Sequence, residues 1–176
     1  MGKLIVLIGY MGAGKTTLGK ALASNLGRDF CDLDWYIEAR YHKTVADIFA
    51  ERGEDGFRQI ERNMLHEVAE FQDNVIAVGG GTPCFFDNMD YLNANTETVY
   101  IKASVNTLIE HIHISNTKRP LLEGKSDEEL VGFINDALLK REPYYLKANH
   151  ILHIETIHLQ EEIDAYVEQI KQLTAQ

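Results

Sequence analysis

The sequence predicts an α/β fold of three layers, in which helices cover both faces of a central five-stranded parallel sheet. Short apolar runs alternate with longer stretches of helical periodicity, at residues 3–8, 29–33, 74–78, 96–101 and 150–154. A chain of 176 residues can bury a core without a disulfide or a structural metal. We therefore expect one domain over residues 1–176.

The charge balance and the cysteine content limit the possible partners. Lys plus Arg number 17 against 27 Asp plus Glu, and the formal charge of -10 argues against nucleic acid as a partner. No apolar run is long enough to span a bilayer or to form the core of a signal peptide, so we expect no membrane association. Two cysteines do not make a disulfide framework, which favours the cytoplasm.

The first expected strand leads directly into a phosphate-binding loop. Residues 9–16 read GYMGAGKT and match the P-loop pattern GxxxxGK[ST], followed by the helical run 17–26. Glycines let backbone N–H groups curl around a phosphate, and the helix N-terminus adds positive potential. The alternative is a glycine-rich turn that only connects strand to helix. We assign these residues to the phosphates of ATP: Gly12, Ala13, Gly14, Lys15, Thr16 and Thr17. The hydroxyl of Thr16 is also offered to Mg²⁺.

Two carboxylates stand at the end of the second expected strand. Asp32 and Asp34 flank Leu33, and residues two apart in an extended chain point to the same side. We expect Asp32 near the metal and Asp34 on the acceptor hydroxyl, which it can orient or deprotonate. The alternative for either carboxylate taken alone is that it caps the following helix.

The helix expected after Gly53 carries a carboxylate, Glu61, within its apolar face. That buried charge needs a partner, and Arg58 lies one helical turn earlier. Arg58 can pair with Glu61 and at the same time reach a carboxylate ligand. A purely structural ion pair is the alternative.

A run of three glycines, Gly79, Gly80 and Gly81, follows the third expected strand. Glycines permit close approach of a ligand to backbone N–H groups, although a bend without a ligand is the alternative. Two capping patterns, Thr44 with Asp47 and Ser126 with Glu129, indicate the starts of helices.

Two arginines complete the candidate site. Arg119 lies in the polar stretch 115–125, the best candidate for a mobile surface loop, and can close over the transferring phosphate. Arg141 lies near the end of a helix. A solvated surface arginine is the alternative for both. The last helix has an apolar face that should pack on the sheet, formed by Leu159, Ile163, Tyr166, Val167, Ile170 and Leu173.

Taken together, these motifs resemble the shikimate kinase family in identity, order and spacing. The motifs are residues 9–16, 32–34, 57–58 with Glu61, 79–81, 119–122 and 141–144, and the resemblance spans residues 3 to about 154. It implies transfer of the γ-phosphate of ATP to the 3-hydroxyl of shikimate, with Mg²⁺. It also implies a monomer with the fold of nucleoside monophosphate kinases.

The resemblance implies a role for each candidate residue. The catalytic residues would be Lys15, Asp34 and Arg119, and shikimate would be bound by Asp34, Arg58, Gly80, Gly81 and Arg141. Phe49, Phe57 and Glu61 would support the acceptor site, while Thr16 would bind Mg²⁺ directly and Asp32 through water. The acceptor-binding helices would lie at about 33–62 and a lid carrying Arg119 at about 112–125.

The sequence departs from the family at the adenine end. Family members commonly have an arginine that stacks on the base seven residues before the lid arginine, where this chain has Ile112. His111 or His113 can substitute, or apolar and backbone contacts hold the base. Two loop histidines without a third ligand do not predict a metal site.

Other readings keep the P-loop but explain less. A gluconate kinase or a nucleoside monophosphate kinase does not account for Arg58, the glycine run and Arg141 together. A nucleotide-dependent switch without phosphoryl transfer needs no acceptor site.

Overall fold

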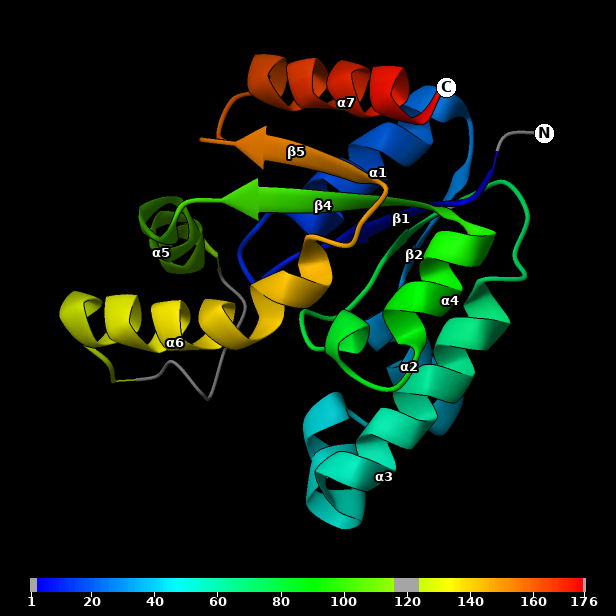
Figure 1. The fold of residues 1–176 in the computed structure, drawn as a ribbon, viewed down its shortest axis with the longest axis vertical. Coiled ribbons are helices and arrows are strands. Elements are labelled where there is room, and N and C mark those ends of the chain that lie inside the picture. The colour runs from blue at the N-terminus through cyan, green and yellow to red at the C-terminus, as the bar shows by residue number, and fades with distance from the viewer. Residues whose placement is uncertain (1–2, 116–123, 176) are drawn as a thin grey trace.

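The computed structural model describes residues 3–115 and 124–175 and has a parallel five-stranded sheet between two layers of helices (Figure 1). The strands are β1 (Ile5–Ile8), β2 (Asp29–Asp32), β3 (Asn74–Ala77), β4 (Glu97–Ala103) and β5 (His150–Ile154). Their order is β2-β3-β1-β4-β5, and every neighbouring pair is parallel. The predicted fold class is confirmed, and each expected strand agrees with the observed one to within two residues at either end.

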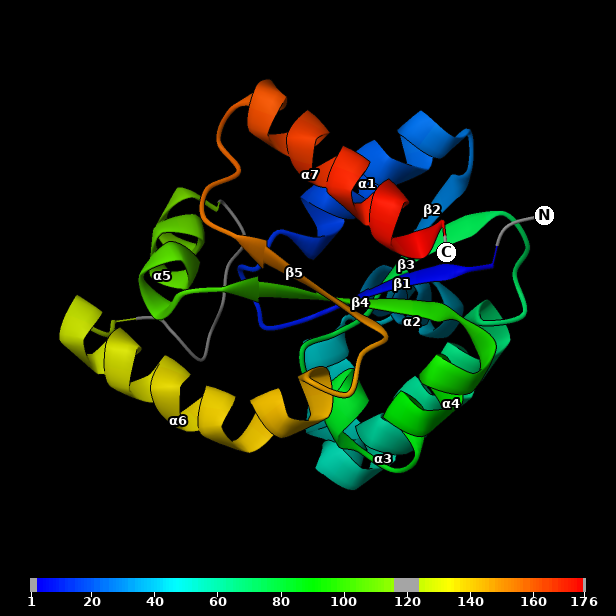
Figure 2. The ribbon, with the colours of Figure 1, turned by 45° about the horizontal axis from the view of Figure 1, so that its top comes forward.

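The helices divide between the two faces of the sheet. On one side lie α1 (Lys15–Leu26) and α7 (Gln160–Thr174), and on the other α3 (Val45–Val68), α4 (Asn88–Asn95) and α6 (Asp127–Tyr145) (Figure 2). The short helix α2 (Leu33–Tyr41) packs on α3, and α5 (Val105–Ile114) packs on α6 beyond the carboxyl end of β4. A 3-10 turn (Thr82–Cys84) follows the glycine run. None of the helices in the described ranges is long and apolar enough to cross a membrane.

Burial explains the sequence pattern of the sheet. Strands β1 and β3 are buried along their whole length, since helices cover both faces, and each therefore consists almost entirely of apolar residues. In α7 the expected apolar face buries Val167 and Ile170. Leu159 departs from that expectation: it precedes the helix as its N-cap residue and is 61% exposed.

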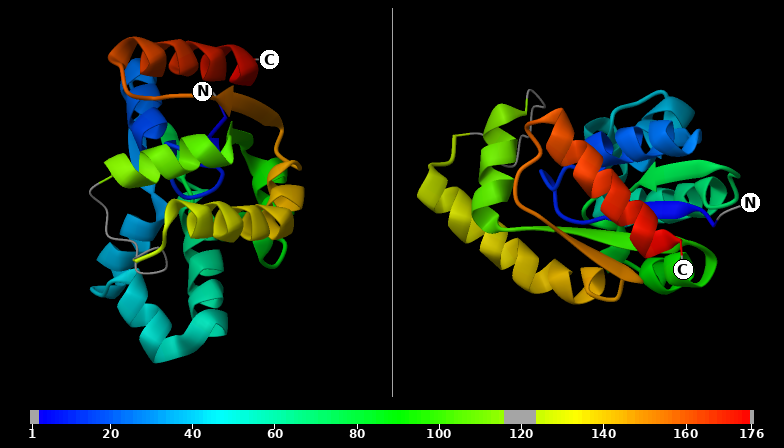
Figure 3. Two further views of the ribbon diagram at one scale, coloured as in Figure 1. Left: turned by 90° about the vertical axis from the view of Figure 1, so that its left-hand side faces the viewer. Right: turned by 90° about the horizontal axis from the view of Figure 1, so that it is seen from above.

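Helix α3 has a kink that shapes the acceptor side. Gly53 adopts φ 68° and ψ -178°, which glycine tolerates and which interrupts the helix (Figure 3). The helix expected after Gly53 is therefore the second part of a longer element, whose first part begins at the predicted Thr44–Asp47 capping box. Across the kink the rings of Phe49 and Phe57 stack with centroids 4.3 Å apart.

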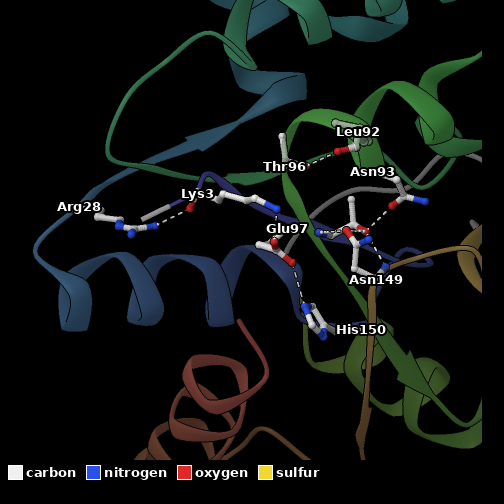
Figure 4. A network of polar contacts seen from close by, with 9 residues as sticks. Lys3, Arg28, Leu92, Asn93, Thr96, Glu97, Asn149 and His150 are labelled. Carbon is white, nitrogen blue, oxygen red and sulfur yellow. Dashed lines mark hydrogen bonds and ion pairs between the residues drawn. The ribbon is translucent and has the colours of Figure 1, made fainter. Parts of the chain in front are cut away.

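A polar network joins strands at the amino-terminal edge of the sheet (Figure 4). Glu97 accepts hydrogen bonds from Nζ of Lys3 at 2.8 Å and pairs with Nε2 of His150 at 3.0 Å. The backbone N–H of Thr98 donates to Oδ1 of Asn149, and the N–H of Asn149 donates to the hydroxyl of Thr98. These bonds tie β1, β4 and β5 together at the edge opposite to the P-loop.

Candidate active site

A pocket of about 580 Å³ opens at the carboxyl ends of the strands, where ligands of parallel α/β sheets bind. Its walls come from five segments that are distant in sequence. These segments are the P-loop with the start of α1, the β2–α2 junction, the glycine run, the end of α5 and the chain after β5. The residues that line the pocket include Lys15, Thr16, Thr17, Asp32, Asp34, Gly79, Gly80, His111 and Ile157.

The P-loop connects β1 to α1, as its sequence pattern predicts. Gly12 and Gly14 have positive φ values of 81° and 84°, which favour glycine over residues with a side chain. Helix α1 begins at Lys15, so the N–H groups of its first turn face the pocket end of the helix. The ammonium of Lys15 donates to the carbonyls of Gly9 and Tyr10 at 2.8 and 2.9 Å, which holds the positive charge within the loop.

Asp32 both caps a helix and faces the P-loop. Its Oδ1 accepts from the N–H groups of Asp34 and Trp35, and its Oδ2 accepts from the hydroxyl of Thr16 at 3.0 Å. The expectation that Asp32 and Asp34 are aligned by an extended chain is wrong, because α2 begins at Leu33 and Asp34 lies in its first turn. The cap brings the two carboxylates together instead.

Burial makes the Asp34 carboxyl unusually basic. The pKa of Asp34 is raised from 3.8 to about 6, first by desolvation and then by the negative charges of Asp32 and Glu61, while the positive charge of Lys15 opposes the shift. A side chain at Gly79 would place its Cβ 3.1 Å from Oδ1 of Asp34, so this carboxyl lies directly against the glycine run. Such a carboxyl is ionised at neutral pH yet can accept a proton from a reacting hydroxyl.

The glycine run brings together the two arginines that the sequence places far apart. A Cβ at Gly81 would lie 2.7 Å from Nη2 of Arg58, and one at Gly80 would lie 3.5 Å from Nη1 of Arg141. The same Gly80 position is 3.5 Å from the carbonyl oxygen of Gly9 in the P-loop. Two guanidinium groups therefore converge beside the phosphate-binding loop.

Arg58 is held by a buried ion pair. Its Nη1 donates to Oε2 of Glu61 at 2.9 Å, and Glu61, which is 1% exposed, also accepts from the hydroxyl of Thr82. The predicted pair is thus present. Because Glu61 is fixed by two partners, it orients Arg58.

Aromatic rings surround the rest of Arg58. Its guanidinium carbon lies 4.1 Å from the ring centroid of Phe85, 5.3 Å from Phe57 and 5.7 Å from Phe49. Within the described residues its Nε is buried without a hydrogen-bond partner. Phe49 and Phe57 were expected from the family resemblance. Phe85 was not, because it follows the 3-10 turn and belongs to no motif.

The histidine region differs from its expected structure. His111 and His113 lie in helix α5 and not in a loop. His111 is 9% exposed, and its Nδ1–H donates a hydrogen bond to the carbonyl of Gly12 at 2.8 Å. His113 is exposed and pairs with Asp127 at 2.8 Å, while Ile112 packs against the core.

Two residues of the β5–α7 connection, Ile157 and His158, line the pocket and were missed by the sequence analysis. A Cβ at Gly14 would lie 2.2 Å from Cδ1 of Ile157, so this connection covers the P-loop. The rings of His158 and His111 meet edge to face with centroids 5.6 Å apart. Their position directly after the last strand, at the carboxyl edge, is the signal that would have indicated them.

Arg119 lies outside the described residues, as do residues 116–123 of the expected lid. Residues 112–114 form the last turn of α5. The lid and the role of Arg119 stay predictions.

Comparisons with known proteins agree on one family. The family model described as shikimate kinase matches residues 11–172. A shikimate kinase of Phocaeicola vulgatus is 54% identical over 167 residues, covering 95% of each chain, and one of Bacteroides fragilis is 52% identical, covering 96% of this chain and 94% of its own.

Solved structures give the same result. The crystal structure of shikimate kinase from Bacteroides thetaiotaomicron is 49% identical, with a TM-score of 0.96 and 99% of each chain covered. Shikimate kinase from Acinetobacter baumannii, solved in complex with shikimate, is 31% identical with a TM-score of 0.84, covering 99% of this chain and 94% of its own.

Proposed function

The chain belongs to the shikimate kinase family and is a phosphotransferase, and we propose that it transfers the γ-phosphoryl group of ATP to the 3-hydroxyl of shikimate. One observation carries this proposal. Arg58 and Arg141 meet at Gly80 and Gly81, next to the P-loop and to Asp34. An acceptor with one carboxylate and a hydroxyl fits this arrangement.

The two arginines account for the choice of acceptor. The two guanidinium groups lie against adjacent glycines and repel each other. Glu61 at 2.9 Å and the exposed Glu54 at 3.5 Å both pair with Arg58, which leaves the positive charge of Arg141 for a ligand. A carboxylate bound between the two arginines balances that charge and accepts charge-assisted hydrogen bonds. A sugar without a carboxylate leaves Arg141 without that anion. Phe49 and Phe57 then form a wall for the ring of the acceptor.

The reaction requires an in-line attack on the γ-phosphorus. The acceptor oxygen forms a bond to phosphorus, the bond to the β–γ bridging oxygen breaks, and ADP leaves. Asp34 orients the hydroxyl and accepts its proton, for which the raised pKa of about 6 suits it. Lys15 and the N–H groups of the P-loop stabilise the charge on the phosphates, and Arg119 closes over them.

The residues at the P-loop fit a magnesium ion. The Thr16 hydroxyl and an Asp32 carboxylate oxygen lie 3.0 Å apart at the pocket wall, and Mg²⁺ prefers oxygen ligands. Thr16 would bind the ion directly and Asp32 through water. An ion held there would neutralise negative charge on the phosphates.

The nucleoside extends away from Asp34, towards α5 and the β5–α7 connection. Ile157 and His158 line that end of the pocket, whereas His113 turns to Asp127. We assign the adenine contacts to Ile157 and His158, and to His111 the support of the P-loop carbonyl.

The enzyme works as a monomer in the cytoplasm. The monomer is what the resemblance to the shikimate kinase family implies. Both cysteines are free, as in a reducing compartment. Light scattering at micromolar concentration measures the oligomeric state, and a dimer would contradict this assignment.

An ADP-release assay with MgATP and different acceptors tests the proposal. We expect turnover with shikimate and only background release with gluconate, AMP or no acceptor. Mass spectrometry should detect a monophosphorylated shikimate, and phosphorus NMR should place the phosphate on the 3-hydroxyl. Turnover with gluconate or AMP but not shikimate would contradict the proposed acceptor.

A further inference from the structure

Tyr145, the last residue of α6, joins that helix to the glycine run. Its side chain is fully buried, and its hydroxyl donates a hydrogen bond to the carbonyl oxygen of Gly80. Arg141 lies four residues earlier, on the same face of α6, with Nη1 close to the same glycine. One helical face therefore supplies both an acceptor-binding cation and a tether for the backbone beside it.

The tether fixes the direction of a backbone donor. In a trans peptide the C=O and the following N–H point to opposite sides. When Tyr145 holds the Gly80 oxygen, the N–H of Gly81 is turned away from Tyr145. Consecutive glycines can otherwise rotate this peptide with little steric resistance, so the position needs an external restraint.

Burial keeps the Tyr145 hydroxyl in its donor form. Desolvation raises the pKa of this phenol, and the nearby positive charge of Arg141 opposes that effect without reversing it. A buried hydroxyl without a partner would cost free energy, so the bond to Gly80 is the arrangement that the packing favours. The ring of Tyr100 packs against the ring of Tyr145, with the two centroids 5.1 Å apart.

We infer that Tyr145 is a positioning residue for the acceptor: its hydroxyl sets the Gly80–Gly81 peptide, and its place on α6 sets Arg141 relative to that peptide. The inference rests on the proposed function, since the group that it positions is the binding site for the acceptor carboxylate and ring. The P-loop has its own restraint, the bond from His111 to Gly12. Loss of the Tyr145 hydroxyl should therefore affect the acceptor and not ATP.

The test compares Tyr145→Phe with Tyr100→Phe. Both tyrosines are buried and adjacent, but the hydroxyl of Tyr100 donates to Glu142 and not to the glycine run. We expect Tyr145→Phe to raise the KM for shikimate about tenfold, the loss typical of one buried hydrogen bond, and to change the KM for ATP less than twofold. Tyr100→Phe should change neither KM by more than twofold, although both variants lower the Tm.

Calorimetry with MgADP present measures the affinity of both variants for shikimate and so makes the same comparison without turnover. Equal increases in both KM values, or a Tyr145→Phe enzyme that matches Tyr100→Phe, would overturn the inference and leave the proposed function intact. A wild-type enzyme that does not phosphorylate shikimate would overturn the proposed function and this inference with it.

Discussion

The two edges of the sheet use polar residues in opposite ways. At the amino-terminal edge, polar groups satisfy one another within the protein: Glu97 forms an ion pair with Lys3 and a hydrogen bond with His150. At the carboxyl-terminal edge, like charges are also brought together: Asp34 lies beside Asp32, and Arg58, although paired with Glu61, meets Arg141 at the glycine run.

The difference separates stability from function. Groups that satisfy one another stabilise the folded chain, whereas like charges held close together weaken it and are available to a ligand. Substitutions at the amino-terminal edge should therefore lower stability and spare catalysis. Substitutions at the carboxyl-terminal edge should lower catalysis without lowering stability. Three variants test this distinction.

The largest effect should come from Lys15→Met. Lys15 is the cation that the proposed function assigns to the phosphates, and loss of its ammonium should lower kcat on the order of 10³-fold, as for other groups that stabilise transition-state charge. Lys3→Met, the same substitution at the other edge, should leave kcat within twofold. Steady-state kinetics measure both.

Unfolding curves complete this comparison. Lys15→Met should remain folded, with a circular dichroism spectrum like that of the wild type. A kcat that falls equally in the two variants, or a Lys15→Met chain that does not fold, would break the distinction between the edges.

Asp34→Asn should lose activity and gain stability. Removal of the proton acceptor should lower kcat on the order of 10²-fold. Since folding raises the pKa of Asp34 from 3.8 to about 6, its ionised form costs roughly 3 kcal/mol of stability at pH 8.

The sign of this effect follows from proton linkage. A pKa raised in the folded state gives stability below pH 4 that is lost as the pH rises through 6. The Tm of Asp34→Asn should therefore exceed that of the wild type at pH 8, exceed it by about half as much at pH 5, and come close to it only below pH 4. A variant that is less stable at pH 8 would contradict the cost assigned to this carboxylate.

The smallest effect should come from Glu97→Gln. Loss of its pairs with Lys3 and His150 should destabilise the chain by about 1 kcal/mol, with a Tm lower by about 3 °C and kcat unchanged. The difference should shrink in 1 M salt, which screens ion pairs. A fall in kcat without a fall in Tm would contradict the structural role.

Local signals made much of the fold and part of the site predictable from the sequence. The P-loop and the capping boxes at Thr44 and Ser126 involve neighbouring residues, and the pair of Arg58 with Glu61 spans one helical turn. Such contacts follow from backbone geometry alone.

Contacts between distant elements could not be predicted in this way. The capping of α2 by Asp32 was one of the two alternatives left open for this carboxylate. No sequence pattern indicated that His111 reaches Gly12 or that Tyr145 reaches Gly80. Each depends on how helices pack on the sheet. The convergence of Arg58 and Arg141 was expected from family resemblance and not from spacing.

The convergence of Arg58 and Arg141 is tested most directly by a binding comparison. Shikimate and its uncharged methyl ester are each bound to the wild type and to Arg141→Ala. By calorimetry with MgADP present, the wild type should bind shikimate about 100-fold more tightly than the ester, because two arginines contact one carboxylate. In Arg141→Ala this preference should fall to about tenfold or less, while affinity for MgADP stays the same. A preference that is unchanged by the substitution would show that Arg141 does not bind the acceptor carboxylate.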